Sequence, residues 1–261
     1  METTKQTAAS ISSTQNILSA LVVGTALLGS LLAEPGSVAQ ASSSTLSSQR
    51  PAELLQEAHR LRLHAIRLYH ARELLGREYR TSLVRKTESL KDVETFVLNT
   101  VQKSLPSEWR KTSKRIAQAV LSQSIQHGFD PIFVLSVIMT ESTFRPSMVG
   151  GVGEVGLMQI RPETAEWLAK KIGYTRYTGR ASLFDPVVNI ELGTAYFAML
   201  RENFDEDGGL YIAAYNMGSK NVRRIVASAK RPKEYSGRIM GRYRQYYRDF
   251  APTQPTRVAM N

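Results

Sequence analysis

The order of apolar and polar residues predicts a chain built almost entirely of helices. Residues 52–83 are rich in helix formers, and their apolar positions, which include Leu54, Leu61 and Leu75, recur close to every 3.6 residues. Further helical patterns cover 91–101 and 107–127. Asp130-Pro131 then supplies an N-cap and a first-turn proline for a continuous apolar run. Little of this half of the chain has the alternating pattern of a strand.

The rest of the chain continues the same pattern. The predicted helices cover 131–142, 162–171, 186–200, 209–218, 219–230 and 233–250. Residues 150–156, with the sequence GGVGEVG, predict a flexible loop. The expected fold class is mainly α: one catalytic-type domain at 107–250, preceded by a helical extension at 52–106 and followed by a frayed tail at 251–261.

The N-terminal segment, residues 1–41, is expected to be a signal peptide or a membrane anchor. An uncharged apolar run occupies 17–33, and Ala39-Gln40-Ala41 has the small-x-small form of a cleavage site. A serine-rich linker at 42–51 follows. If the segment is cleaved off, the protein is exported, and if it is retained, it tethers the protein to the membrane. Both alternatives place the remainder in the periplasm or cell envelope, whereas a third, a buried cytosolic helix, does not.

Charge and composition limit the kinds of molecule that the protein could bind and the kinds of chemistry that its side chains could perform. The 261 residues include 34 Lys and Arg against 23 Asp and Glu, a net charge of +11, which favours an anionic partner such as nucleic acid, a membrane surface or an acidic wall polymer. The chain has no cysteine, which excludes disulfides and thiolate chemistry. Its four histidines lack metal-ligand spacing, and no nucleotide-type glycine loop is present, so no metal and no cofactor are predicted. Nucleic acid is disfavoured because the aromatic residues follow no RNA-recognition pattern.

Glu141, in the stretch MTESTF, is the candidate for acid–base chemistry. On a helix that begins at Pro131 it shares a face with Val134, Val137 and Ile138. An apolar wall disfavours the charged carboxylate, so we expect a raised pKa. A carboxylic acid with a raised pKa can protonate a poor leaving group near neutral pH. The alternative from position alone is a glutamate at a helix end that points to solvent.

Three motifs around and after this residue resemble one family. Residues 141–167, ESTFRPSMVGGVGEVGLMQIRPETAEW, are similar to the soluble lytic transglycosylase (SLT) domain, a relative of the lysozymes that cleaves bacterial peptidoglycan. LFDPVVNIELG (183–193) and AAYNMG (213–218) match two further segments of that family in the same order. The resemblance extends from about residue 116 to about residue 235 and implies a lysozyme-like α-helical catalytic domain.

The resemblance also implies a mechanism. Glu141 would protonate the oxygen between N-acetylmuramic acid and N-acetylglucosamine. The same side chain would then take the proton of the muramoyl C6 hydroxyl, which attacks its own anomeric carbon and closes a 1,6-anhydro ring. Because the nucleophile belongs to the substrate, one carboxyl can suffice.

Six further residues are candidates for substrate binding by this resemblance: Gln159, Tyr215, Ser142, Asn216, Met158 and Glu154. Tyr215 is expected to reach into the cleft and to form a hydrogen bond near the carboxyl. Each has a structural alternative. Gln159 would cap the loop, Ser142 would tie the helix end, and Met158 would pack in the core. Asn189 is expected to hold the loop from beneath, and Gly153 and Gly156 to supply backbone conformations that other residues find costly.

Three positions depart from the commoner family pattern. Gly150 stands where many relatives have a serine, and Arg161 where methionine is frequent. Arg161 could meet a carboxylate of a peptide stem. Glu154 stands where a small residue is common; it would either hold a water and favour hydrolysis or fix the loop by an ion pair.

The expected activity is therefore a peptidoglycan lytic transglycosylase. The alternatives are a lysozyme-like muramidase that hydrolyses the same bond, and a non-catalytic protein that binds the wall or assists assembly. For the extension at 52–106 the sequence leaves three roles open: docking on the catalytic domain, binding a protein partner, or closing the groove.

Overall fold

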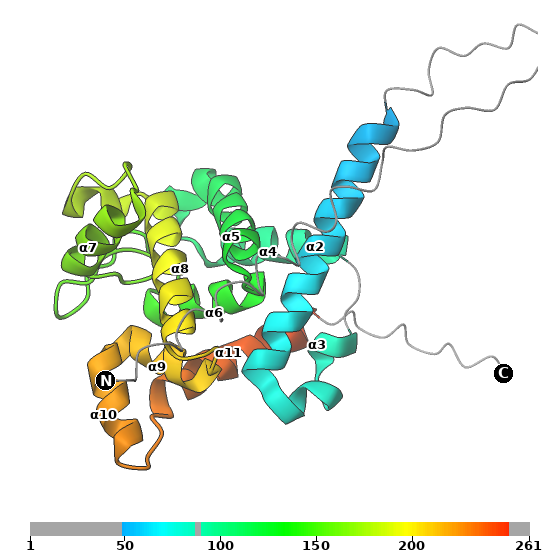
Figure 1. The fold of residues 1–261 in the computed structure, drawn as a ribbon. Coiled ribbons are helices and arrows are strands. Elements are labelled where there is room, and N and C mark those ends of the chain that lie inside the picture. Colours follow the sequence, from blue (N-terminus) through cyan, green and yellow to red (C-terminus); the bar gives the residue numbers. More distant parts are fainter. Residues whose placement is uncertain (1–48, 87–89, 251–261) are drawn as a thin grey trace, which may run out of the picture. The chain divides into compact units, whose positions relative to one another are not determined.

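The computed structural model describes residues 49–86 and 90–250, which form helices joined by loops (Figure 1). The α-helices of this part are α2 (Gln49–Leu75), α3 (Leu83–Lys86), α4 (Leu90–Ser104), α5 (Ser113–His127), α6 (Pro131–Glu141), α7 (Pro162–Ile172), α8 (Pro186–Asn203), α9 (Gly208–Met217), α10 (Ser219–Ala227) and α11 (Glu234–Phe250). The 3-10 helices are η1 (Gly76–Thr81), η2 (Ser107–Thr112) and η3 (Arg180–Phe184). Within the described ranges no strand forms, and the predicted mainly α class is confirmed.

The predicted signal peptide or anchor at 1–41 and the tail at 251–261 lie outside the described residues. Most of the predicted linker at 42–51 does too, although α2 already begins at Gln49. No helix in the described ranges is both long enough and apolar enough to span a bilayer.

Helix α2 is shorter than the sequence pattern predicts. The pattern runs to about residue 83, but the α-helix ends at Leu75 and continues as the 3-10 helix η1. The break falls at Gly76, whose φ of +51° lies in the left-handed region that glycine enters at little cost.

The buried face of α2 also differs from the predicted apolar stripe. Leu54 and Leu61 were expected on that stripe, yet they are 70% and 59% exposed. The residues that α2 buries are Leu63, Arg67, His70, Ala71 and Leu75. Leu75 belongs to the predicted stripe, but two of the other buried residues are polar, and apolar periodicity cannot identify those two. They are buried because they have partners in the second half of the chain.

Those partners surround Asp130, the N-cap residue of α6. Its carboxylate accepts hydrogen bonds from Tyr243 (2.7 Å) and Tyr247 (2.5 Å), both in α11. Its backbone N–H donates to Nδ1 of His70 at 3.0 Å, which leaves the proton of a neutral imidazole on Nε2, 2.8 Å from the hydroxyl of Tyr211. Burial lowers the pKa of His70 well below its usual value, so the ring is neutral. Helices α2, α6, α9 and α11 are thereby joined.

An ion pair supplies the second attachment of α2. Arg201 of α8 donates from Nε to Oε2 of Glu73 at 2.9 Å, and both side chains are largely buried. Burial raises the pKa of Glu73, while the arginine opposes that shift. The described part of the helical extension therefore packs on the domain that carries the predicted site.

Two hydrophobic clusters make up the core of the part of the chain that the structure describes. The larger one takes side chains from α2, α4, α5, α6, α8, α9 and α11, with the apolar stretch of α6 fully enclosed. The smaller one lies under α7 and the 149–160 loop and includes Val155, Ile160, Leu168 and Leu192. This second cluster supports the loop that faces the site.

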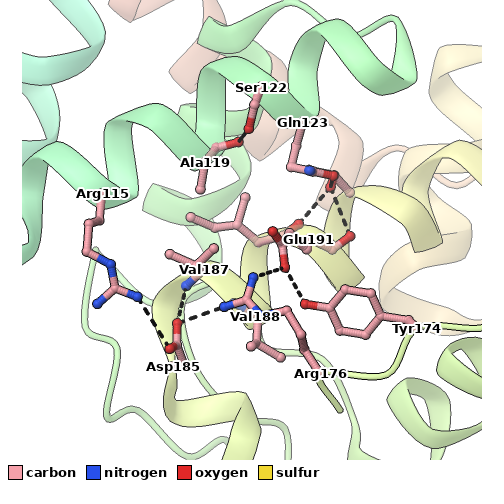
Figure 2. Close-up of polar contacts among 12 residues, drawn as sticks. Arg115, Ala119, Ser122, Gln123, Tyr174, Arg176, Asp185, Val187, Val188 and Glu191 are labelled. Atoms are coloured by element: carbon pink, nitrogen blue, oxygen red, sulfur yellow. Dashed lines mark hydrogen bonds and ion pairs between the residues drawn. The ribbon is translucent and has the colours of Figure 1, made fainter.

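Polar contacts along α8 fasten the neighbouring loop (Figure 2). Asp185 caps the start of α8 and pairs with Arg115 of α5 at 3.6 Å. One turn further, Glu191 accepts hydrogen bonds from Arg176 (2.7 Å) and from the hydroxyl of Tyr174. These contacts hold the segment between α7 and α8 against α8.

Candidate active site

Glu141 is the last residue of α6, and the local sequence explains its position. The carboxylate of Asp130 caps the helix by accepting from the backbone N–H of Ile132 at 2.9 Å, and Pro131 occupies the first turn, as predicted. Every residue from Pro131 to Ile138 is buried. A helix held in the core as far as Ile138 presents its final side chain, three residues later, with little freedom.

The end of α6 is tied to the following loop. The hydroxyl of Ser142 donates to the carbonyl oxygens of Ile138 (3.2 Å) and Leu157 (2.8 Å). Asn189 lies beneath the loop: its Oδ1 accepts from the N–H of Met158 at 2.7 Å, and its Nδ2 donates to Val155 O at 2.8 Å. The predicted tie at Ser142 and the predicted support from Asn189 are both present.

Glycines allow this loop to approach α8 closely. Gly156 has φ +81°, and a Cβ there would lie 2.3 Å from Nδ2 of Asn189. Gly153 has φ +93°, so both glycines adopt the conformations expected of them. Gln159 enters the left-handed region at φ +47° although it has a side chain. Its Nε2 stabilises the turn by donating to Gly156 O (2.9 Å) and Met148 O (3.2 Å).

A cleft of about 530 Å³ opens beside Glu141. Its wall includes four of the six predicted substrate-binding residues: Glu154, Gln159, Tyr215 and Asn216. The other two do not line it; Ser142 and Met158 are 1% and 0% exposed and lie in the core beneath. Residues that sequence reasoning did not select, including Thr164, Tyr196 and Asn221, complete the wall.

The aromatic hydroxyl next to the carboxyl belongs to Tyr235, which sequence reasoning missed. Tyr235 is in α11 and its hydroxyl donates to Oε1 of Glu141. Tyr215 lines the cleft as expected, but its hydroxyl donates to the carbonyl oxygen of Met158 at 2.8 Å. Its ring stacks on Phe197, with centroids 3.9 Å apart. The sequence offered one signal for a tyrosine from α11 at the site, which is that residues 233–250 contain several tyrosines. That composition does not show which of the tyrosines contacts Glu141.

Burial raises the pKa of Glu141 to about 7, in the direction that the sequence predicts. The hydrogen bond from Tyr235 and the positive charge of Arg238 oppose the shift, and the negative charge of Glu154 adds to it. A carboxyl group with this pKa exists in both protonation states near neutral pH. It can therefore give a proton and take one back within a single reaction cycle.

Glu154 and Gly150 are sterically coupled. A Cβ at position 150 would lie 2.4 Å from Oε2 of Glu154 and 2.7 Å from Oε1 of Gln159. The carboxylate of Glu154 also accepts from Val152 N at 3.2 Å and pairs with Arg161 at 3.5 Å. Glycine at 150 thus leaves room for the carboxylate, and the ion pair is the loop-fixing contact that the sequence left open.

The described residues contain no group of three or more His, Asp or Glu side chains arranged to hold a metal ion. The titratable acids that line the cleft in this part of the chain are Glu141 and Glu154.

A comparison with protein families decides the identity of this region. Residues 118–236 match the family model described as "Transglycosylase SLT domain". This region is therefore similar to a transglycosylase SLT domain. Glu141, the loop to Gln159, and the motifs at 183–193 and 213–218 all lie inside it, and so does Tyr235.

Curated relatives agree with the SLT match. The chain is 30% identical over 169 residues to "Membrane-bound lytic murein transglycosylase C" of Sodalis glossinidius, covering 61% of this chain and 46% of the relative. It is 32% identical over 158 residues to the protein of that name in Klebsiella pneumoniae, covering 58% and 43%. The chain thus spans less than half the length of these relatives.

Among solved structures, the 70-kDa soluble lytic transglycosylase SLT70 of Escherichia coli is similar, with a TM-score of 0.47 and 27% identity, over 51% of this chain and 24% of that one. A complex of the 70-kDa soluble lytic transglycosylase with bulgecin A has the same TM-score and covers 57% and 27%.

Proposed function

We propose that this protein is a peptidoglycan lytic transglycosylase of the cell envelope, with Glu141 as its general acid and then its base. The observation that carries the proposal is the buried carboxyl of Glu141, with a pKa of about 7, on the wall of a 530 Å³ cleft inside an SLT domain. The names of the curated relatives, membrane-bound lytic murein transglycosylases, support the same activity.

The reaction proceeds by two proton transfers on one side chain. Protonated Glu141 gives its proton to the glycosidic oxygen as the bond from that oxygen to the muramoyl C1 breaks. The muramoyl C6 hydroxyl then attacks C1, and its proton passes to the carboxylate of Glu141. The products are a 1,6-anhydromuramoyl end and a free 4-hydroxyl on N-acetylglucosamine, and the enzyme returns to its starting state.

The surrounding groups assist each half of this cycle. Burial keeps Glu141 protonated for the first transfer, and the hydroxyl of Tyr235 stabilises the carboxylate that results. Gln159 and Asn216, on the cleft wall, are proposed to hold amide or hydroxyl groups of the sugars. The hydrolase alternative rests on Glu154, whose carboxylate lines the same cleft and could hold a water.

Glu141→Gln tests the activity directly. We expect digestion of isolated peptidoglycan to fall by about 10³-fold or more, because the amide cannot donate or accept the required proton. Mass spectrometry of the wild-type digest should give 1,6-anhydromuropeptides. Reducing muramoyl ends would favour the hydrolase, and equal wall binding by both proteins without any digestion would favour the non-catalytic alternative.

The free energy of unfolding, measured at a series of pH values for the wild type and for Glu141→Gln, verifies that the variant folds. It also verifies that the carboxyl group of Glu141 is buried in the wild type. Since the folded pKa of Glu141 is raised from 4.5 to about 7, its contribution to stability is greatest below pH 4.5 and is lost as the pH rises through 7. The lost contribution is at most ~3 kcal/mol. Glu141→Gln should therefore gain stability relative to wild type above pH 7. If the difference in unfolding free energy between wild type and Glu141→Gln stayed the same from pH 4.5 to above pH 7, the burial of the carboxyl group would be contradicted.

A further inference from the structure

A second cleft continues from the first one along the surface of the SLT domain. It has a volume of about 590 Å³, and Thr164 and Tyr196 line both clefts. Helices α7, α8 and α10 form its walls. A ligand bound next to Glu141 can therefore reach the second cleft past Thr164 and Tyr196, which line both.

The second cleft presents an aromatic ring and two cations. Trp167 of α7 is 48% exposed, an unusual exposure for tryptophan. Lys171, one turn later, places its Nζ 5.1 Å from the centre of the Trp167 ring and 3.8 Å from the sulfur of Met199. Arg223 of α10 lines the opposite side, with Cζ 5.6 Å from the ring of Phe204.

Neither cation is neutralised by a carboxylate. Within residues 49–86 and 90–250, Lys171 and Arg223 form no ion pair, whereas the adjacent Lys170 pairs with Glu166 at 2.7 Å. Glu163 is the one acidic residue that lines the second cleft among the described residues. Aromatic rings and a thioether hold the two positive charges in place but leave their hydrogen-bond donors available to an anion.

We propose that this cleft binds the anionic peptide arm of the polymer while its glycan strand lies beside Glu141. The proposal rests on the proposed function and names a second part of the same substrate: a short peptide with free carboxylates, covalently joined to the sugar being cleaved. Lys171 and Arg223 contact the carboxylates, and the exposed ring of Trp167 packs on the peptide's aliphatic side chains.

The test compares glycan strands that keep their peptides with strands stripped of them by an amidase. The Lys171→Gln/Arg223→Gln variant of the full chain should lose about tenfold in kcat/KM on peptide-bearing strands, the effect of two solvent-accessible charge contacts. It should cleave stripped strands like the wild type. Lys170→Gln, one residue away and already paired with Glu166, is the matched control and should be unaffected on both substrates.

Binding measurements separate this proposal from the proposed activity. In a Glu141→Gln background, which removes cleavage, the same two charge substitutions should weaken binding to peptide-bearing strands and leave binding to stripped strands unchanged. Raising the salt concentration should reduce the difference, because the contacts are exposed. This result would support the peptide site even if wild-type protein digests neither substrate.

Three outcomes would overturn the proposal. Equal losses on both substrates, or a Trp167→Ala defect as large on stripped strands as on peptide-bearing ones, would make the cleft a sugar subsite. Binding and cleavage that do not respond to the charge substitutions on either substrate would show that the cleft takes no part in recognition.

Discussion

Tyr235 and Glu154 act in opposite directions on the proton of Glu141. The hydrogen bond from Tyr235 favours the carboxylate and lowers its pKa, whereas the negative charge of Glu154 disfavours the carboxylate and raises it. Burial is the largest contribution and sets the pKa at about 7. The two side chains therefore shift the pKa of Glu141 in opposite directions, which bears on the acid and base roles proposed for it.

Tyr235→Phe should move the basic limb of the pH profile of kcat/KM to higher pH. The limb reports the pKa of the acid in the free enzyme, and loss of a hydrogen bond to a charged group corresponds to about one pH unit. The measurement is a pH–rate profile on isolated peptidoglycan. A limb that stays in place would mean that Tyr235 does not stabilise the carboxylate.

Glu154→Gln is the matched change of opposite sign. Removal of its negative charge should lower the pKa of Glu141 and move the basic limb to lower pH. Its products should remain 1,6-anhydromuropeptides if Glu154 only fixes the loop through Arg161. If the variant shifted the products from hydrolysed to anhydro ends, Glu154 would be the water-holding base of a hydrolase.

At the scale of elements, α8 adds side-chain hydrogen bonds to those that the backbone of the 149–160 loop makes within itself. Asn189 is buried, and its side chain bonds the loop at the N–H of Met158 and the carbonyl of Val155, and bonds the end of η3 at Leu183 O, 3.0 Å away. The loop forms isolated β-bridges and no continuous β-sheet hydrogen bonding, so its backbone cannot take the place of the bonds from Asn189.

Asn189→Ala should destabilise the fold by ~3 kcal/mol, because one N–H and two carbonyl groups lose their buried partner. Chemical denaturation measures the change. Asn203→Ala, at the exposed end of the same helix, is the control and should alter stability by less than ~0.5 kcal/mol. Equal, small effects of both substitutions would contradict the supporting role of Asn189.

At the scale of the whole molecule, the extension and the SLT domain share one core. Val93, Val97 and Val101 of α4 are fully buried in the same cluster as Ile116 and Val120 of α5. Helix α2 adds the polar attachment through His70 and Glu73. The extension therefore contributes to folding, whatever further partner it has.

A chain that begins at residue 107 should consequently fail to unfold cooperatively. The deletion exposes the apolar face of α5 and leaves the partners of His70 and Glu73 unpaired. A chain that begins at residue 62 is the matched control, because the described side chains between 51 and 61 are exposed. It should keep the melting temperature of the longer protein. Cooperative melting of the 107–261 chain at that same temperature would contradict a shared core.

The sequence determined those features that depend on local patterns. Helix starts at Asp130 and Asp185 follow from caps and prolines, and the glycines at 153 and 156 follow from backbone sterics. The position of Glu141 at the end of a run without other ionisable residues indicated a raised pKa, although position alone also allowed a glutamate that points to solvent. A helix cap, a glycine with positive φ and a helical repeat of apolar residues each depend on a few neighbouring residues. They can therefore be predicted from the sequence without knowledge of the fold.

Only the tertiary structure decided which distant groups meet. Tyr235 lies 94 residues from Glu141, and His70 lies 60 residues from Asp130. Apolar periodicity predicted the burial of Leu75 but missed Arg67 and His70, which partners elsewhere in the chain allow to be buried. Desolvation and pairing are properties of a side chain's whole surroundings, and packing assembles those surroundings from helices that the linear sequence keeps apart.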